Sequence, residues 1–425
     1  MSESPNSAAL EPHARPWVLL ALTLSAPILL NYAGWWFGAG ESVGPAALIA
    51  LALAFGAGLG AAALRARWMV PAFLFCLALM VASVGSPTFD WDARSIWLFH
   101  AKRIHLDGSL FAQLDDYAPW SHNDYPVIVP ALSASLATLV GGWNELHPKL
   151  GGTLALAAPV ILLSAVFRSS IAIQLFLAAT LLVCGRLLIN GFMDAILAMY
   201  GLAALVLAAL AFRRGDAEGT AGSTVSAVLP ATAFSAVCSV LVLLKNEGAV
   251  LFGLIVASFV AASLLTRQGF APLRLLVACL LPVLLVGSWR LACARAGVTN
   301  DLAGTDLVGQ FAARAADLGN WSLIARQLTW HTVAPVTLFV LLLVLRFPQA
   351  GMRRGLAVSG LLLTLGYTAF LCFAYLGTPH DLGWHLDTSL RRTTLPLGIL
   401  ALGLAVVLLA PGSRDATRRP TEQTA

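Results

Sequence analysis

The stretch DAILAMYGLAALVLAALAF, residues 194–212, decides the fold class of this chain. After one aspartate it is apolar to its end, and its length is close to the roughly 20 residues that a helix needs to cross a bilayer. About a dozen further runs of this kind follow one another along the sequence, and together they cover most of it. The pattern predicts a helical protein that crosses the membrane many times.

The overall composition excludes the main alternative classes. Of 425 residues, 59% are apolar and 11% are charged, whereas soluble domains have about 45–50% apolar and about 25% charged residues. The chain is therefore neither a soluble globular protein nor a disordered one. Its net charge of +5 is typical of basic cytoplasmic loops and gives no reason to expect a nucleic-acid partner. The cysteines have no C-x-x-C spacing and are expected to be packing residues.

We expect an all-α polytopic membrane protein with a single transmembrane domain over residues 1–425. About 12 transmembrane helices are expected, together with one re-entrant or half helix. The apolar segments lie at 17–37, 44–64, 68–87, 126–142, 149–167, 171–190, 194–212, 225–244, 249–266, 273–291, 331–347, 355–376 and 393–410.

The orientation follows from the basic residues, because cytoplasmic loops are enriched in lysine and arginine. One set is assigned to the cytoplasm, with both termini: Arg65, Arg67, Arg168, Arg213, Arg214, Arg267, Arg346, Arg353, Arg354, Arg414, Arg418 and Arg419. Residues 88–125 and 292–330 then become outer loops. An odd number of crossings must separate 88–125 from Arg168, so either 126–142 or 149–167 is expected to be a half helix. Such a segment is tolerated where it is buried in protein or lines a cavity.

Six cations are left over on the outer side, where the anionic inner leaflet does not attract them: Arg94, Lys102, Arg103, Lys245, Arg391 and Arg392. Each of them alone could reach a lipid phosphate. They form three groups, however, and each group has a carboxylate beside it. A lipid-linked phosphate or pyrophosphate is the expected ligand, because arginine offers a planar fork and lysine a point charge. The candidates are Arg94, Lys102, Lys245, Arg391 and Arg392.

The sequence FDWDARSIW, residues 89–97, opens the first outer loop. Asp92 is interpreted either as a helix N-cap or as a general base at the bilayer edge, with Asp90 beside it. The two aspartates could also hold a divalent cation such as Mg²⁺ or Mn²⁺, although no cofactor is certain. Residues 93–106 are expected to form an amphipathic helix that places Ile96, Trp97, Phe99 and Ile104 in the membrane interface.

Three further polar motifs interrupt the apolar runs on the outer side. They are SHNDYP at 121–126, GFMD at 191–194 and KNEG at 245–248. Each could be a simple turn or helix cap, and the lysine and glutamate of KNEG could pair with each other. The alternative is a substrate-binding role for His122, Asp124, Tyr125, Asp194 and Glu247. The chain contains no P-loop, zinc-protease helix or nucleophile elbow.

At these residues the chain resembles the GT-C superfamily of polyprenyl-phosphate-sugar glycosyltransferases. The similarity is greatest to the bacterial branch related to protein O-mannosyltransferases and aminoarabinose transferases. WDARSIW at 91–97 is similar to the acidic motif of that family's first outer loop, and HNDYP at 122–126 to its His/Tyr-Pro motif. GFMD and KNEG match two later motifs, and Arg391 or Arg392 matches a late outer arginine.

The resemblance implies an inverting glycosyltransferase of a bacterial inner membrane, with a GT-C-like fold and a periplasmic active site. Its donor would be a polyprenyl-phosphate sugar, and its acceptor a glycan, a lipid or a protein; membrane lipids would surround it. Asp92 would take the acceptor proton, while Arg94, Lys245 and Arg391 would hold the leaving phosphate. Two alternatives stay open: a flippase for a lipid-linked glycan, and an O-antigen ligase or polymerase that uses a pyrophosphate-linked donor.

Overall fold

The computed structural model describes residues 14–115, 117–167, 170–213, 222–300, 306–348 and 351–409. These residues are helical apart from their connections and one isolated bridge between Arg213 and Phe270. Both chain termini lie outside the described residues, as do several of the arginines assigned to the cytoplasm: Arg168, Arg214, Arg414, Arg418 and Arg419.

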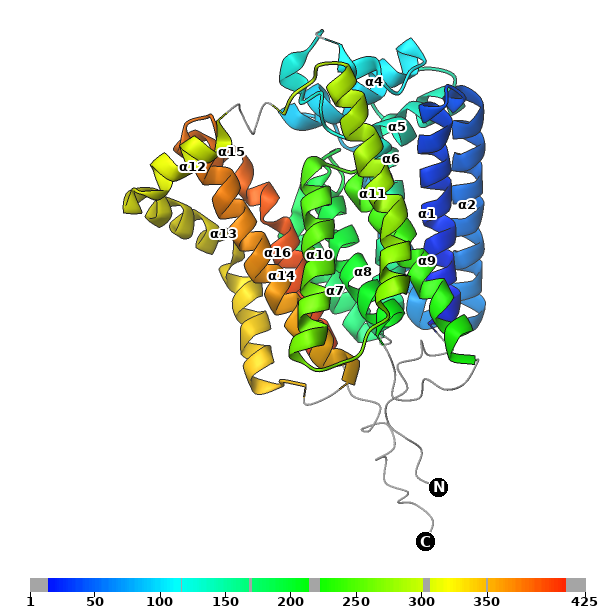
Figure 1. Cartoon of the computed structure of the whole chain (residues 1–425). Helices are drawn as coiled ribbons and strands as arrows, with labels where there is room; N and C mark the ends of the chain where they lie inside the picture. The colour runs from blue at the N-terminus through cyan, green and yellow to red at the C-terminus, as the bar shows by residue number, and fades with distance from the viewer. Residues whose placement is uncertain are drawn as a thin grey trace.

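The described residues form sixteen α-helices, and Figure 1 labels most of them in the same way. Their bounds are α1 Arg15–Trp36, α2 Gly40–Arg65, α3 Val70–Gly85, α4 Leu98–Asp107, α5 Ile128–Leu139, α6 Leu150–Phe167, α7 Ser170–Cys184, α8 Asp194–Phe212, α9 Gly222–Val242, α10 Asn246–Leu265, α11 Pro272–Arg295, α12 Leu307–Ala315, α13 Leu318–Leu345, α14 Gly351–Leu376, α15 Leu382–Thr393 and α16 Leu395–Leu409. Within the described ranges, 11 helical segments are long and apolar enough to cross a membrane. The prediction of a polytopic α-helical membrane protein is confirmed at this level.

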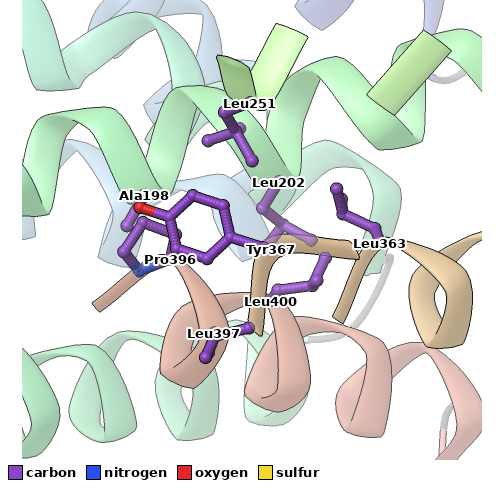
Figure 2. A pocket seen from close by; sticks show the side chains of 9 residues that line it. Ala198, Leu202, Leu251, Leu363, Tyr367, Pro396, Leu397 and Leu400 are labelled. Carbon is purple, nitrogen blue, oxygen red and sulfur yellow. The ribbon is translucent and has the colours of Figure 1, made fainter. Parts of the chain in front are cut away.

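Helix α8 forms the centre of the bundle, and its membrane-length window is buried throughout. Small residues let its neighbours approach closely: an added Cβ at Gly201 would lie 2.6 Å from the Leu251 side chain of α10. Figure 2 shows where α8, α10, α14 and α16 meet around Tyr367. The space between them is only ≈ 10 Å³ and mostly apolar, about the size of one water probe. This junction is packed core and forms an apolar floor below the polar end of α8.

A cap covers one end of the bundle (Figure 1), where α4 lies across the helix ends and α5 follows beneath it. The cap is built from the segment between α3 and α5. Ile96, Trp97 and Ile104 are buried in it at 3% exposure or less. The expectation that these three side chains insert into the membrane interface is therefore wrong. Helix α5 packs against α4, which carries Ile104, and the Trp97 ring stacks on that of Tyr125.

Helix α5 has 12 residues and is about 18 Å long at 1.5 Å per residue, which is too short for a hydrocarbon core of about 30 Å. Of the two segments considered for a half helix, the structure thus makes 126–142 the short one, while His147–Phe167 has membrane-spanning length. Buried hydrogen bonds attach α5 to α1. Trp35 Nε1 donates to Ser135 Oγ at 2.7 Å, and Ser135 Oγ donates to Asn31 Oδ1 at 2.5 Å.

The stretch 292–330, expected as an outer loop, is largely helical in its described part, because α12 lies within it and α13 already begins at Leu318. The carboxylate of Asp306 accepts a hydrogen bond from the Gly309 amide at 3.0 Å, and that of Asp317 accepts one from Gly319 at 2.8 Å. These N-caps start both helices. The first turns of α13 contain polar residues, so the apolar pattern of the sequence placed the start of this helix too late.

Candidate functional site

An ionic cluster lies beneath the cap, at the N-terminal ends of α8 and α10. We define it by its five residues: Asp92, Asp194, Lys245, Glu247 and Arg392. Lys245 Nζ lies 3.1 Å from Asp194 Oδ1 and 2.9 Å from Glu247 Oε1. Arg392 forms an ion pair with Asp92 and also interacts electrostatically with Asp194. The cluster therefore joins four segments that are distant in sequence.

Close backbone packing fixes the KNEG turn. Lys245 has an extended backbone, and its carbonyl accepts a hydrogen bond from the Gly248 amide at 2.8 Å, as α10 begins. A Cβ at Gly248 would lie 2.1 Å from the carbonyl oxygen of Leu241, so only glycine fits without a shift of the backbone. This close contact fixes the conformation of the turn that carries Lys245 and Glu247.

The GFMD motif shapes the neighbouring wall. Gly191 has a φ of +93°, which favours glycine, and it turns the chain so that α8 begins at Asp194. The Phe192 ring lies 5.0 Å below the guanidinium carbon of Arg392, within the range of a cation–π contact. The motif thus supplies both an acid to Lys245 and an aromatic surface to Arg392.

Aromatic rings pack beside the cluster. The Tyr125 ring stacks on those of Trp97 and His122, with ring centres 5.4 and 5.1 Å away. Lys245 Nζ lies 5.6 Å from the centre of the Tyr125 ring. His122 has a φ of 53°, an uncommon conformation for a residue other than glycine. It holds its ring in this stack.

Burial and charge oppose each other at Lys245. Burial by itself lowers the pKa of the ammonium, but Asp194 and Glu247 outweigh that effect and hold the pKa well above its usual value. Burial also raises the pKa of Tyr125 well above its usual range. The site therefore holds a permanently charged ammonium beside a neutral phenol.

A second ion pair borders the cluster. Asp124 Oδ2 lies 3.3 Å from Arg290 Nη1 and accepts a hydrogen bond from Asn246 Nδ2 at 2.6 Å. The Asp124 backbone oxygen accepts another from Trp289 Nε1 at 2.8 Å. Arg290 keeps 44% of its side chain exposed, against 1% for Asp124. The aspartate thus orients the arginine, and the guanidinium remains accessible.

An amphipathic cavity of ≈ 230 Å³ opens beside these residues. Its lining combines Arg290 and Glu247 with neutral groups that form hydrogen bonds and with apolar side chains. The lining residues are Tyr125, Asn246, Glu247, Val250, Arg290, Asn300, Leu307, Phe370, Leu371, Phe373, Ala374, Tyr375, His385 and Thr393. Of the five cluster residues, Glu247 is the one in this lining.

Several residues predicted for the site lie elsewhere. Asp90 pairs with Arg186 at 2.9 Å and accepts a hydrogen bond from Asn190 at 2.6 Å. Arg94 and Arg391 are exposed and do not line the cavity. Lys102 is exposed as well, with its Nζ 5.9 Å from the centre of the Trp143 ring.

The two outer-loop aspartates do not form a shared set of metal ligands. Asp90 faces Arg186, whereas Asp92 faces Arg392, so each carboxylate already has a cationic partner. Among the described residues, no group of three or more histidine, cysteine, aspartate or glutamate side chains could hold a metal ion. The hypothesis of a Mg²⁺ or Mn²⁺ site at this pair does not fit the arrangement.

Sequence reasoning did not assign several polar residues of the cavity to the site, among them Arg290, Asn246, Tyr375 and His385. Arg290 carried a usable signal, because it is a cation at the outer end of an apolar segment. The rule that singled out Lys245 and Arg392 would have found it. Tyr375 Oη lies 2.8 Å from both Ser389 Oγ and Thr393 Oγ1 of α15. That helix was not predicted, because it is short and polar.

The chain was also compared with known proteins. No family model, no curated protein and no solved structure matches it.

Proposed function

We propose that the protein is an integral-membrane glycosyltransferase that moves a sugar from a polyprenyl-phosphate-linked donor to an acceptor. One observation carries the proposal: charged residues from distant segments meet at one end of a hydrophobic bundle, beside a cavity lined by both polar and apolar residues. This arrangement is consistent with the GT-C resemblance of the sequence motifs. It also suits a substrate with a charged head and a hydrocarbon chain.

The cavity supports a lipid-linked donor in three ways. Arg290 offers a partly exposed guanidinium for a phosphate. Neutral hydrogen-bonding groups such as Asn246 and Tyr375 suit sugar hydroxyls. Phe370 and Phe373 line the side on which a polyprenyl chain would lie. A free sugar nucleotide would need more positive charge and no apolar wall.

The proposed topology has about 12 spans, with α9 as the one added to the 11 long segments and α5 as a half helix beneath the cap. Helix α8 begins in the ionic cluster and ends beside Arg213, and α10 begins there and ends near Arg267. These arginines lie at the end of the bundle opposite the cap, which supports a cytoplasmic assignment for that end. Both termini would then be cytoplasmic, and the site would face the periplasm of a bacterial inner membrane.

In the proposed reaction the acceptor oxygen attacks the anomeric carbon of the sugar. The bond from that carbon to the phosphate oxygen breaks, and its electron pair stays on the phosphate. Arg290 and Arg392 stabilise the charge that develops there, while a carboxylate of the ionic cluster takes the proton of the acceptor hydroxyl. Asp92 is the base assigned from the sequence motif.

The test uses the full chain in proteoliposomes with undecaprenyl-phosphate carrying one radiolabelled hexose or pentose at a time, plus envelope extract as the acceptor source. Chromatography separates labelled product, remaining donor and freed lipid. We expect transfer of label together with release of undecaprenyl monophosphate. The matched control Asp107→Asn removes an outer acid that pairs with Arg103 and should leave the rate unchanged.

Two outcomes would contradict the proposal. Consumption of a pyrophosphate-linked donor alone would indicate a ligase or polymerase. Movement of labelled lipid across the bilayer without any sugar transfer would indicate a flippase.

A further inference from the structure

The charges of the ionic cluster do not balance. Asp92 has Arg392 as its partner, whereas Asp194 and Glu247 share the single ammonium of Lys245. Three carboxylates thus face two cations. Excess negative charge in a partly desolvated site is costly, and one additional proton would neutralise it. The cluster therefore holds one carboxylate more than it has cations.

Among the described residues, two buried carboxylate oxygens of the cluster lack a hydrogen-bond partner. Asp194 Oδ2 and Glu247 Oε2 are both buried and have no hydrogen-bond partner within the described part of the chain. Their surroundings differ, because the Asp194 side chain is 2% exposed and does not line the cavity, whereas the Glu247 side chain is 16% exposed and does. The Glu247 side chain thus borders the cavity, with its Oε2 covered by protein atoms, whereas the Asp194 side chain does not border it.

We infer that Glu247, and not Asp92, accepts the proton of the acceptor hydroxyl, an inference that rests on the proposed glycosyltransferase function. As the acceptor oxygen forms its bond to the anomeric carbon, its proton passes to Glu247 Oε2. The electron pair of the breaking bond passes to the phosphate oxygen. Glu247 returns the proton to water before the next turnover.

This assignment gives the other cluster residues distinct tasks. Lys245 holds Glu247 by Oε1 and leaves Oε2 for the acceptor. Asp92 orients Arg392 and is a positioning residue. Arg290 lines the same cavity as Glu247, so the proton acceptor and the cation for the leaving phosphate share one space. Asp92 is not among the residues that line it.

A purely structural role for Glu247 would be that of a first-turn acid of α10 that pairs with Lys245. Asp194 makes a matched comparison, because it pairs with the same lysine and begins α8, but has no access to the cavity. A structural role predicts similar effects of Glu247→Gln and Asp194→Asn. A role in proton transfer predicts effects that differ in kind.

The experiment uses the proteoliposomes and the donor for which the wild type shows transfer. Glu247→Gln should lower turnover at saturating donor by about 10²–10⁴-fold, while the KM for the donor stays within about threefold. Sodium formate, a small carboxylate that can enter the space left by truncation, should restore part of the turnover of Glu247→Ala. It should not restore Asp194→Ala or Asp92→Ala. Asp92→Asn should act chiefly by raising the KM for the donor.

The outcomes separate the two proposals. If the wild type transfers no sugar from any donor, the proposed function fails and this inference fails with it. If the wild type is active, the inference alone is overturned by either of two results: Glu247→Gln keeps more than about a tenth of the turnover, or formate restores Asp92→Ala and not Glu247→Ala.

Discussion

Asp92 and Arg392 form an ion pair although they lie 300 positions apart in the sequence. Asp92 belongs to the cap that precedes α4, and Arg392 to the last turn of α15. The pair therefore connects the first outer segment to the C-terminal part of the bundle. The Arg392 and Asp92 side chains keep only 17% and 23% exposure, so solvent screens their attraction less than at an open surface.

The first prediction concerns the coupling within this pair. Asp92→Asn and Arg392→Gln each leave one charge without its partner, and both should lower the thermal midpoint of the detergent-solubilised protein. The double variant should lose less stability than the sum of the losses in the two single variants. The difference, which is the coupling free energy of the pair, should be about 0.5–3 kcal/mol. Thermal unfolding of the four proteins of this cycle measures it, and strict additivity would contradict the pairing.

The second prediction concerns Gly248. In Gly248→Ala the new methyl group would meet the Leu241 carbonyl, so the KNEG turn must shift and Lys245 and Glu247 move with it. We expect lower stability and a large loss of transfer activity. Gly253→Ala is the matched control, because it lies in the same helix with open space around its Cβ position. Equal tolerance of both substitutions would show that the turn is not tightly packed.

The third prediction concerns the attachment of α5. Ser135→Ala removes the hydroxyl that bridges Trp35 and Asn31. The buried indole N–H of Trp35 and the buried amide oxygen of Asn31 then lose that partner, which costs about 1–3 kcal/mol. Thr23→Ala is the control, since its exposed hydroxyl bonds only to the Leu19 carbonyl of its own helix. Thermal unfolding in detergent compares the two, and a smaller loss in Ser135→Ala would argue against the network.

The fourth prediction is a pH dependence that arises from His100 of α4. Burial lowers the pKa of this histidine from 6.5 to about 3. Between these values the unfolded chain binds a proton that the folded cap does not, so stability is complete above pH 6.5 and falls as the pH decreases. The expected slope is up to about 1.4 kcal/mol per pH unit.

Thermal unfolding between pH 7 and pH 4 should therefore show a steeper loss of stability with decreasing pH in the wild type than in His100→Phe. His147 is exposed, and His147→Gln serves as the control for the removal of a histidine.

The fifth prediction concerns Arg290. If this side chain holds a phosphate, Arg290→Gln should weaken binding of undecaprenyl phosphate by about 10-fold or more, since a hydrogen bond to a charged group contributes about 1.5–3 kcal/mol. Arg295→Gln lies in the same helix, is exposed and does not line the cavity, so it should bind normally. Competition with labelled donor measures both affinities. Equal binding by the two variants would remove Arg290 from the phosphate site.

The membrane-embedded architecture followed from the sequence because bilayer insertion depends on local properties. Twenty apolar residues in a row meet the length and solvation requirements of a spanning helix wherever they occur. The short α5 was also within reach, since the basic residues required one incomplete crossing. The start of α13 and all of α15 were missed because their polar turns are stabilised by Asp317 and Asp381, whose N-cap hydrogen bonds leave no mark on an apolar profile.

The candidate site depended on tertiary structure much more. The motifs around Asp92, Asp194 and Lys245 identified candidate functional residues, because charged side chains near the bilayer core are energetically costly and are often functional. The packing of helices that are far apart in the sequence determines which of these side chains face each other. Packing paired Asp90 with Arg186 and excluded it from the cluster. It also placed Arg290 on the cavity wall.

The sequence by itself determined a bundle of membrane-spanning helices with acids and cations at one end, because hydrophobicity and charge are properties of each segment alone. Only the tertiary structure decided that Asp92 is matched by an arginine, while Asp194 and Glu247 share one lysine. The physical reason is that charge balance and access to a cavity depend on which side chains contact one another in the folded chain. No single residue type or spacing encodes such a set.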